Sequence, residues 1–278
     1  MVIREGNFFK DIFDKEKKIT KDKIEIPKTH YAEIRAAINE SNDLIKKGDK
    51  WNADYTQPDS NDSYEITFQN IIDSPWEDFL IEQKEKQGAT AAMDFMGGGS
   101  CFDKLPIDKK LAVRLLDKLR TLNEDGKSLY SPPPESKVRE VEVISGNVLS
   151  RKTWKKVFAW SEKETEGRGV DLILSRPVAG LAFITKSIDV YYFLIEKLWE
   201  LLNKNGGTLY TQLPIGTDPE LNKNIIAWVS SLEKIPDLEA KFGDSAGFWG
   251  PRSVLRLRKT PNSLLKLPTL EDLQKALK

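Results

Sequence analysis

The sequence predicts an α/β fold with a seven-stranded, mostly parallel sheet, an antiparallel C-terminal hairpin, helices on both faces and a helical N-terminal extension. Two observations carry this prediction. From residue 89 onward, short aliphatic and β-branched runs alternate with helical stretches, which is the pattern of parallel strands joined by crossover helices. Near the C-terminus, two strand-like runs are separated only by a glycine-bearing loop, which is typical of an antiparallel hairpin.

The N-terminal region is rich in Lys, Asp, Glu and Asn, and its clearest pattern is helical. Apolar side chains between residues 31 and 45 fall on one face of a helix. Ser74 followed by Pro75 predicts an N-cap and a first helical residue, for a helix that ends near Gln87 and is closed by Gly88. We therefore divide the chain into a helical extension, residues 1–73, and an α/β domain, residues 74–278.

The strands of the α/β domain are predicted in order along the chain. Five precede the hairpin, at residues 89–96, 111–117, 138–147, 169–177 and 208–214, and the hairpin strands lie in 239–250 and 253–260. A strongly amphipathic helix occupies about 188–202 with Asn205 and Gly206 as its C-cap, another opens at Asp218 and Pro219, and a short capped helix begins at Thr269. The segment 111–122 also fits a helix, and periodicity alone leaves both interpretations open.

Composition excludes several function classes. The 278 residues carry 43 basic and 43 acidic side chains, and this zero balance weakens the case for a surface that binds nucleic acid. A single cysteine, Cys101, forbids an intrachain disulfide and favours a reducing, cytoplasmic location. With one histidine, His30, the chain cannot build the usual Cys/His zinc site; composition leaves a carboxylate-only metal site open, but no metal is predicted. We expect neither a signal peptide nor a membrane span.

Polar side chains and glycines gather at the ends of the predicted strands. Gly97, Gly98 and Gly99 directly follow the first strand, where they allow a sharp turn and a close approach to a ligand. Asp94 lies inside that strand, Asp117 ends the second and Asn147 ends the third. Because the carboxyl ends of parallel strands open onto one edge, these residues predict a nucleotide-like ligand there. Taken singly, each has a plainer interpretation as a loop, helix-face or turn residue.

This ordered series resembles the class I S-adenosylmethionine-dependent methyltransferases, which have a Rossmann-like fold. AMDFMGGGS is similar to their first motif, VRLLD to the second, VEVISGNVL to the third and VDLILSRP to the fourth. The resemblance implies S-adenosylmethionine as cofactor. The residues it assigns to cofactor binding are Asp94, Met96, Gly97, Gly98, Gly99, Asp117, Asn147 and Val148.

The fourth motif departs from the family in a way that bears on the acceptor. It reads Ser175, Arg176, Pro177 instead of the Asn/Asp-Pro-Pro-Tyr used for amino groups of bases and glutamines. We assign Ser175 and Arg176 to the catalytic site beside the acceptor, with a structural salt bridge as the alternative for Arg176. The acceptor itself is not identified, and a small molecule or a protein is favoured over nucleic acid.

The motifs of other enzyme classes that bind nucleotides are missing from this sequence. A nicotinamide-dependent oxidoreductase would need G-x-G-x-x-G, but Phe102 stands three residues after Gly99. A P-loop is excluded because no GK[ST] follows the glycines. A non-catalytic protein that keeps the fold as a scaffold stays open, because the fold alone does not establish activity. Asn147, where the family often has Asp, also leaves that alternative open.

Overall fold

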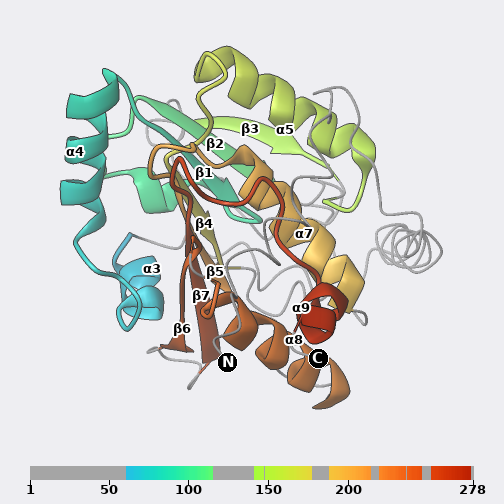
Figure 1. Ribbon diagram of the computed structural model, residues 1–278. Coiled ribbons are helices and arrows are strands. Elements are labelled where there is room, and N and C mark those ends of the chain that lie inside the picture. The colour runs from blue at the N-terminus through green and yellow to red at the C-terminus, as the bar shows by residue number, and fades with distance from the viewer. Residues whose placement is uncertain are drawn as a thin grey trace, which may run out of the picture.

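The computed structural model describes residues 61–114, 141–146, 148–176, 188–213, 219–235, 237–245 and 252–276. Within these ranges seven strands form one sheet in the order β3-β2-β1-β4-β5-β7-β6 (Figure 1). The strands are β1 (Ala91–Phe95), β2 (Lys109–Arg114), β3 (Val141–Ser145), β4 (Leu172–Ser175), β5 (Thr208–Gln212), β6 (Glu239–Ser245) and β7 (Arg252–Arg258). The pairs among β1 to β5 are parallel, and β7 is antiparallel to both β5 and β6. The predicted fold class is confirmed.

Helices lie on both faces of the sheet (Figure 1). One face packs against α5 (Arg151–Glu164), α7 (Ile188–Leu201) and α8 (Pro219–Leu232). The other packs against α3 (Asn61–Phe68) and α4 (Trp76–Gln87). A further helix, α9 (Leu270–Ala276), lies beside α8. The central strands β1, β4 and β5 are therefore buried on both sides, whereas the edge strands β3 and β6 keep exposed residues.

Strand β2 shows that the described part of residues 111–122, which the sequence allowed to be a strand or a helix, is a strand. Leu111 and Val113 of β2 pair with Met93 and Phe95 of β1, and β3 pairs with the other edge of β2. The same side chains would have formed one face of a helix, so pairing with two neighbouring strands decides the conformation. Asp117, the predicted end of this strand, lies outside the described residues.

Two predicted helix caps are wrong. Helix α4 begins at Trp76 with Pro75 in the N-cap position, because the Pro75 carbonyl accepts the first helical hydrogen bond, from Phe79 N–H, while its backbone stays extended. Ser74 is therefore not the cap. Helix α7 ends at Leu201, because Leu202 bridges Val170 and the Asn203 N–H donates to the Val170 carbonyl. Gly206, with φ of 120°, turns the chain into β5 instead of capping α7.

The connection between β1 and β2 also differs from the expected pattern. Instead of a crossover helix it contains a single 3-10 turn, η3 (Ser100–Phe102), followed by turns in which the Leu105 N–H donates to the Phe102 carbonyl and the Ile107 N–H to the Leu105 carbonyl. Phe102, Leu105 and Ile107 bury their side chains in the same core cluster as α3 and α4. Pro106 lacks a backbone N–H and restricts the residue before it, which is consistent with the absence of a longer helix here.

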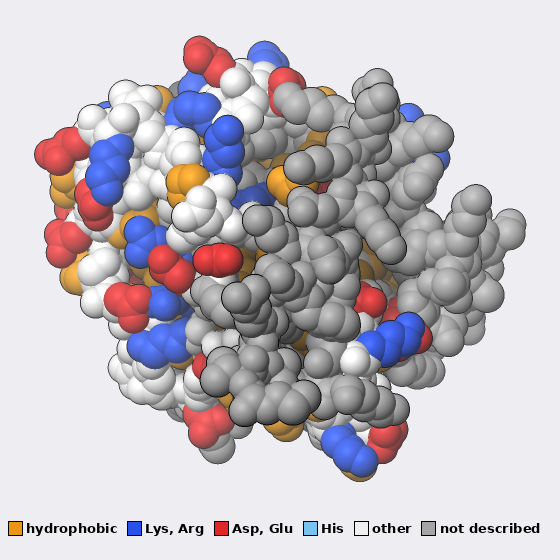
Figure 2. All heavy atoms as spheres, in the orientation of Figure 1, with side chains coloured by type: hydrophobic (Ala, Val, Ile, Leu, Met, Phe, Trp, Pro, Cys, Tyr) orange, Lys and Arg blue, Asp and Glu red, His pale blue; other side chains and the backbone are white. Residues whose placement is uncertain are grey.

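None of the helices in the described ranges is both long and apolar enough to cross a membrane. On the face of the molecule drawn in Figure 2, basic and acidic side chains are interspersed over the described part and form no large area of one sign. This distribution agrees with the balanced composition.

Candidate functional site

Asp94 lies near the carboxyl end of β1, and its side chain is 1% exposed. Its Oδ2 accepts a hydrogen bond from the Gly99 N–H at 2.7 Å, across the turn that follows the strand. Its Oδ1 accepts a hydrogen bond from the Tyr64 hydroxyl at 3.0 Å. The carboxylate is thus held between the glycine turn and helix α3, and hydrogen bonds of this kind offset the cost of burying it.

The glycine turn is closely packed against neighbouring side chains. A Cβ added at Gly97 would lie only 2.0 Å from Asp94 Oδ2, so the carboxylate occupies the space that a side chain would need. Gly99 has a φ of 80°, and a Cβ there would lie 2.7 Å from Val141. Met96 is itself left-handed, with φ of 66°, and its N–H donates to the Val113 carbonyl. Strained backbone of this kind tends to occur at functional sites.

Arg176 follows β4, the strand next to β1, and its side chain turns toward α3. The guanidinium carbon lies 5.0 Å from the centre of the Tyr64 ring, and Nη1 donates to Thr67 Oγ1 at 3.3 Å. Arg176 is partly buried. These contacts are a cation–π interaction and a hydrogen bond to a hydroxyl, and they hold the guanidinium against α3.

Ser175 is the last residue of β4 and lies on the opposite face of the sheet from Arg176. Its side chain is fully buried, and within the described part of the chain its Oγ has no hydrogen-bond partner. Ser175 pairs with Phe95 of β1 and with Thr211 of β5, so all three are neighbours across the sheet. An unsatisfied buried hydroxyl costs free energy, so it is a candidate for contact with a ligand or water.

A second buried hydroxyl belongs to Tyr191 of α7, which lies against Thr211. It too lacks a partner of good geometry in the described ranges. Burial raises the pKa of Tyr191 far above its ordinary value, so the phenol is neutral at physiological pH. The carboxyl ends of β4 and β5 therefore hold two neutral hydroxyl groups on the side opposite to Asp94.

The residues after β3 are only partly described. Gly146 is tightly packed, since a Cβ there would lie 2.3 Å from Thr153 Oγ1. Val148 has its side chain in the core, and its carbonyl accepts a hydrogen bond from Trp154 Nε1 at 2.6 Å. Asn147, like Asp117, lies outside the described residues.

The structure thus places Asp94, Met96, the three glycines and Arg176 at the adjoining ends of β1 and β4, whereas the Ser175 side chain lies at the same ends but on the opposite face of the sheet. Sequence reasoning missed Tyr64 and Thr67 of α3, which contact two of these predicted residues. No sequence signal identifies them, because they precede β1 by more than twenty residues and belong to no motif.

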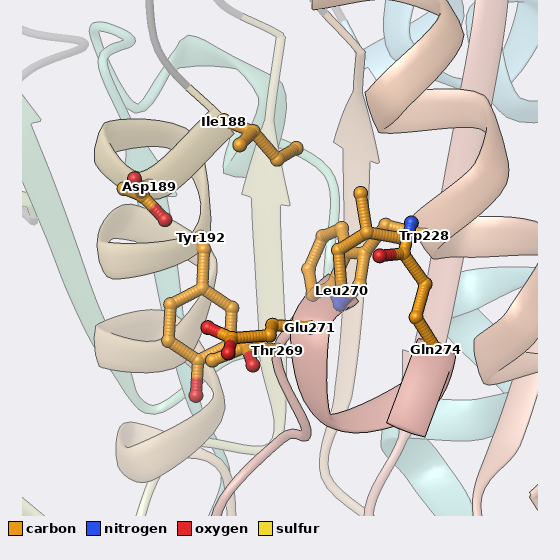
Figure 3. A pocket seen from close by; sticks show the side chains of 8 residues that line it. All are labelled: Ile188, Asp189, Tyr192, Trp228, Thr269, Leu270, Glu271 and Gln274. Carbon is orange, nitrogen blue, oxygen red and sulfur yellow. The ribbon is translucent and has the colours of Figure 1, made fainter. Parts of the chain in front are cut away.

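A separate pocket of about 170 Å³ lies away from the glycine turn, among α7, α8 and α9 (Figure 3). The rings of Tyr192 and Trp228 form part of its wall. The Tyr192 hydroxyl donates to the Leu267 carbonyl and Trp228 Nε1 to the Pro268 carbonyl. Because these polar groups are already bonded within the protein, we place the candidate site at the glycine turn. No cluster of three His, Cys, Asp or Glu side chains suited to a metal occurs in the ranges that the structure describes.

No protein-family model matches the sequence, and no curated protein matches it. Solved structures with a similar fold include an O-methyltransferase from Bacillus cereus in complex with S-adenosylhomocysteine, at 14% identity and a TM-score of 0.41, covering 77% of this chain and 100% of that one. Magnesium protoporphyrin IX methyltransferase from Synechocystis with bound S-adenosylmethionine has 11% identity, a TM-score of 0.43, and coverages of 81% and 97%.

A third is an O-methyltransferase of tomaymycin synthesis from Streptomyces achromogenes, at 10% identity and a TM-score of 0.40, covering 74% of this chain and 92% of that one. The observed sheet order β3-β2-β1-β4-β5-β7-β6, with its antiparallel β7, is the seven-stranded, mostly parallel sheet that the resemblance implied.

Proposed function

We propose that this protein transfers a methyl group from S-adenosylmethionine to an acceptor, at a site formed by the carboxyl ends of β1 and β4. The observation that carries the proposal is the buried Asp94 carboxylate, which accepts the Gly99 N–H and fills the space beside Gly97. Gly97 and Gly99 are required in this turn, because a Cβ there would collide with Asp94 or Val141, and glycine turns of this kind can present backbone N–H groups to a ligand. In open α/β sheets this edge is where ligands bind.

The residues present fit such a cofactor. Asp94, Met96 and the three glycines would hold its methionine part, while Asp117 would hold the ribose and Asn147 the adenine. Val148 would contribute through its backbone only, because its side chain is buried. The shortened connection after the glycines is a departure, because a three-residue 3-10 turn supplies no regular helix N-terminus for the ligand.

The cofactor supplies a methyl group already activated by its sulfonium, so the protein's task is mainly to position the acceptor. Arg176 would bind an anionic group of the acceptor, since it follows β4 directly and a guanidinium forms paired hydrogen bonds with carboxylates and phosphates. Ser175 would offer its buried hydroxyl as a hydrogen-bond donor. A small molecule or a protein side chain is the favoured acceptor.

We further propose that the protein is located in the cytoplasm and that residues 1–73 form an extension that shapes the site.

Calorimetric titration of the purified protein with S-adenosylmethionine and S-adenosylhomocysteine tests the cofactor, with NADH as the negative control. We expect micromolar binding of both sulfur ligands and none of NADH. Asp94→Asn should weaken that binding about tenfold, because the neutral amide accepts the Gly99 N–H less strongly than a carboxylate does. Asp117→Ala should weaken it as well if residue 117 holds the ribose.

Asp171→Asn is a matched control for Asp94→Asn. Asp171 is also a buried aspartate beside β1, but it lies at the amino end, where it accepts hydrogen bonds from Ala91 N–H at 2.9 Å and Asn203 Nδ2 at 2.7 Å. Both substitutions should lower stability, whereas only Asp94→Asn should lower affinity. Absence of binding by the folded wild type would reject the proposal and favour the non-catalytic scaffold, which the shortened connection after β1 also favours.

A further inference from the structure

The carboxylate that holds the glycine turn is itself held by a residue from outside the strand-borne motifs. Tyr64 of α3 is 2% exposed, and its hydroxyl donates to Asp94 Oδ1 at 3.0 Å. The other carboxylate oxygen, Oδ2, accepts the Gly99 N–H. Each oxygen therefore has a different donor, one from α3 and one from the turn, and together they fix the rotation of the carboxylate about its Cβ–Cγ bond.

That rotation matters because the carboxylate is in close contact with the turn. Its atoms lie 2.0 to 2.2 Å from the place where a Gly97 Cβ would be, so it packs directly against the backbone there. Without the Tyr64 hydroxyl, one buried carboxylate oxygen would lose a donor, and the group would reorient toward other donors or water. The turn that follows β1 would then lose its fixed geometry.

The same tyrosine contacts the other half of the candidate site. The guanidinium of Arg176 lies over its ring at 5.0 Å, and Thr67, one helical turn further along α3, accepts a hydrogen bond from Arg176 Nη1. The Tyr64 hydroxyl thus donates to Asp94, which is assigned to the cofactor, and the Tyr64 ring contacts Arg176, which is assigned to the acceptor. Removing only the hydroxyl breaks the first contact and keeps the second.

We propose that Tyr64 is a positioning residue of the cofactor site, which acts through Asp94 to hold the glycine turn in the conformation that binds the amino-acid part of S-adenosylmethionine. The inference rests on the proposed function. It makes α3 a component of the binding site and not only a cover packed on the core. It also predicts that the effect of Tyr64 is limited to ligands that carry the amino-acid part.

The test compares two ligands on the full-length protein by calorimetry: S-adenosylhomocysteine, and 5′-methylthioadenosine, which lacks the amino-acid part. Tyr64→Phe keeps the ring under Arg176 and removes the hydroxyl. We expect it to weaken S-adenosylhomocysteine binding about tenfold, the usual effect of losing a hydrogen bond to a charged group. Its affinity for methylthioadenosine should stay within about twofold of the wild type.

Tyr210→Phe is the matched control. Tyr210 belongs to the same core cluster, and its ring lies 5.5 Å from that of Trp76 and 5.7 Å from that of Phe68. The substitution Tyr210→Phe also removes a largely buried hydroxyl from this face of the sheet, but it removes no contact to Asp94. We expect both ligands to bind Tyr210→Phe as they bind the wild type, and thermal unfolding measures the stability cost of each variant.

A double-mutant cycle with Asp94→Asn asks whether Tyr64 acts through Asp94. Tyr64→Phe should weaken S-adenosylhomocysteine binding in the wild type but have little further effect in Asp94→Asn. An unchanged affinity of Tyr64→Phe, an equal loss for both ligands, or additive effects in the cycle would overturn the inference while leaving the proposed function intact. Failure of the wild type to bind either ligand would overturn both. If Tyr64→Phe does not fold, Thr67→Val and Asp94→Asn are compared instead. Asp94→Asn should weaken S-adenosylhomocysteine binding more than methylthioadenosine binding, whereas Thr67→Val should not distinguish the two ligands.

Discussion

The backbone N–H of Leu267 donates a hydrogen bond to Glu196 Oε2 at 2.9 Å, and this contact joins α7 to the C-terminal segment. The segment is held at further points by aromatic side chains, since Tyr192 donates to the Leu267 carbonyl and Trp199 Nε1 to the Leu264 carbonyl. Glu196 is 6% exposed, and in the described part of the structure its other oxygen has no partner.

Stability should therefore depend on the protonation of Glu196. Burial, and next the nearby Glu200, raise the pKa of Glu196 from 4.5 to about 7, with Lys197 and Lys266 opposing the shift. Because the folded pKa lies above the unfolded one, the protonated form contributes stability that is fully present below pH 4.5 and is lost as the pH rises toward 7. We expect the free energy of unfolding to fall by roughly 2 kcal/mol over this range.

Urea unfolding at pH 5 and pH 7.5 measures this loss, and Glu196→Gln is the comparison. The glutamine variant should lose less stability between the two pH values, because its side chain does not titrate. Lys259, which lies nearby and whose pKa burial lowers to about 8, titrates mainly above this window. An equal pH dependence in the variant and the wild type would contradict the assignment.

Gly97→Ala should disrupt the turn after β1. The new Cβ would lie 2.0 Å from Asp94 Oδ2, so the carboxylate or the backbone must move, at a cost of about 2 kcal/mol. We expect S-adenosylhomocysteine binding to be lost as well. Gly88→Ala is the control: Gly88 has a φ of 81° at the end of α4 and open space around it, so the variant should lose stability but keep its affinity.

Ser175→Ala should stabilise the protein while lowering methyl transfer. The Ser175 hydroxyl is buried without a partner in the described residues, and its removal relieves about 1 kcal/mol of desolvation. Thr165→Val provides the contrast, because the buried Thr165 hydroxyl donates to the Ser161 carbonyl at 2.6 Å and accepts the Gly169 N–H. In chemical denaturation, the free energy of unfolding should rise for Ser175→Ala and fall for Thr165→Val. A destabilised Ser175→Ala would argue against an unsatisfied hydroxyl.

Cys101 should be unreactive in the folded protein. It lies in η3 with no exposed surface, within the core cluster under α3 and α4. A buried thiol in apolar surroundings is protected from reagents. Titration with a thiol-reactive chromogenic disulfide should detect about one thiol in denaturant and almost none in native buffer. Rapid reaction under native conditions would show that this part of the fold opens readily.

The periodicity of apolar residues predicted the strands well, but it did not predict where the elements end. Gly88 was correctly identified as the end of α4, because a left-handed C-cap is a local property of glycine. The end of α7 was not, because it depends on a bridge between Leu202 and Val170, residues that are far apart in the chain. Boundaries set by tertiary pairing have no local signal.

The sequence by itself determined the sheet, its antiparallel hairpin and the glycine turn after β1. The apolar pattern of a strand and the backbone freedom of glycine are both properties of residues that follow one another in the chain. Only the tertiary structure decided that residues 111–114 form a strand, since that segment needs β1 and β3 beside it. Only the tertiary structure brought Tyr64 to Asp94, thirty residues later. The burial of the Asp94 carboxylate depends on donors from two separate segments, and that requirement can be met only when the chain has folded.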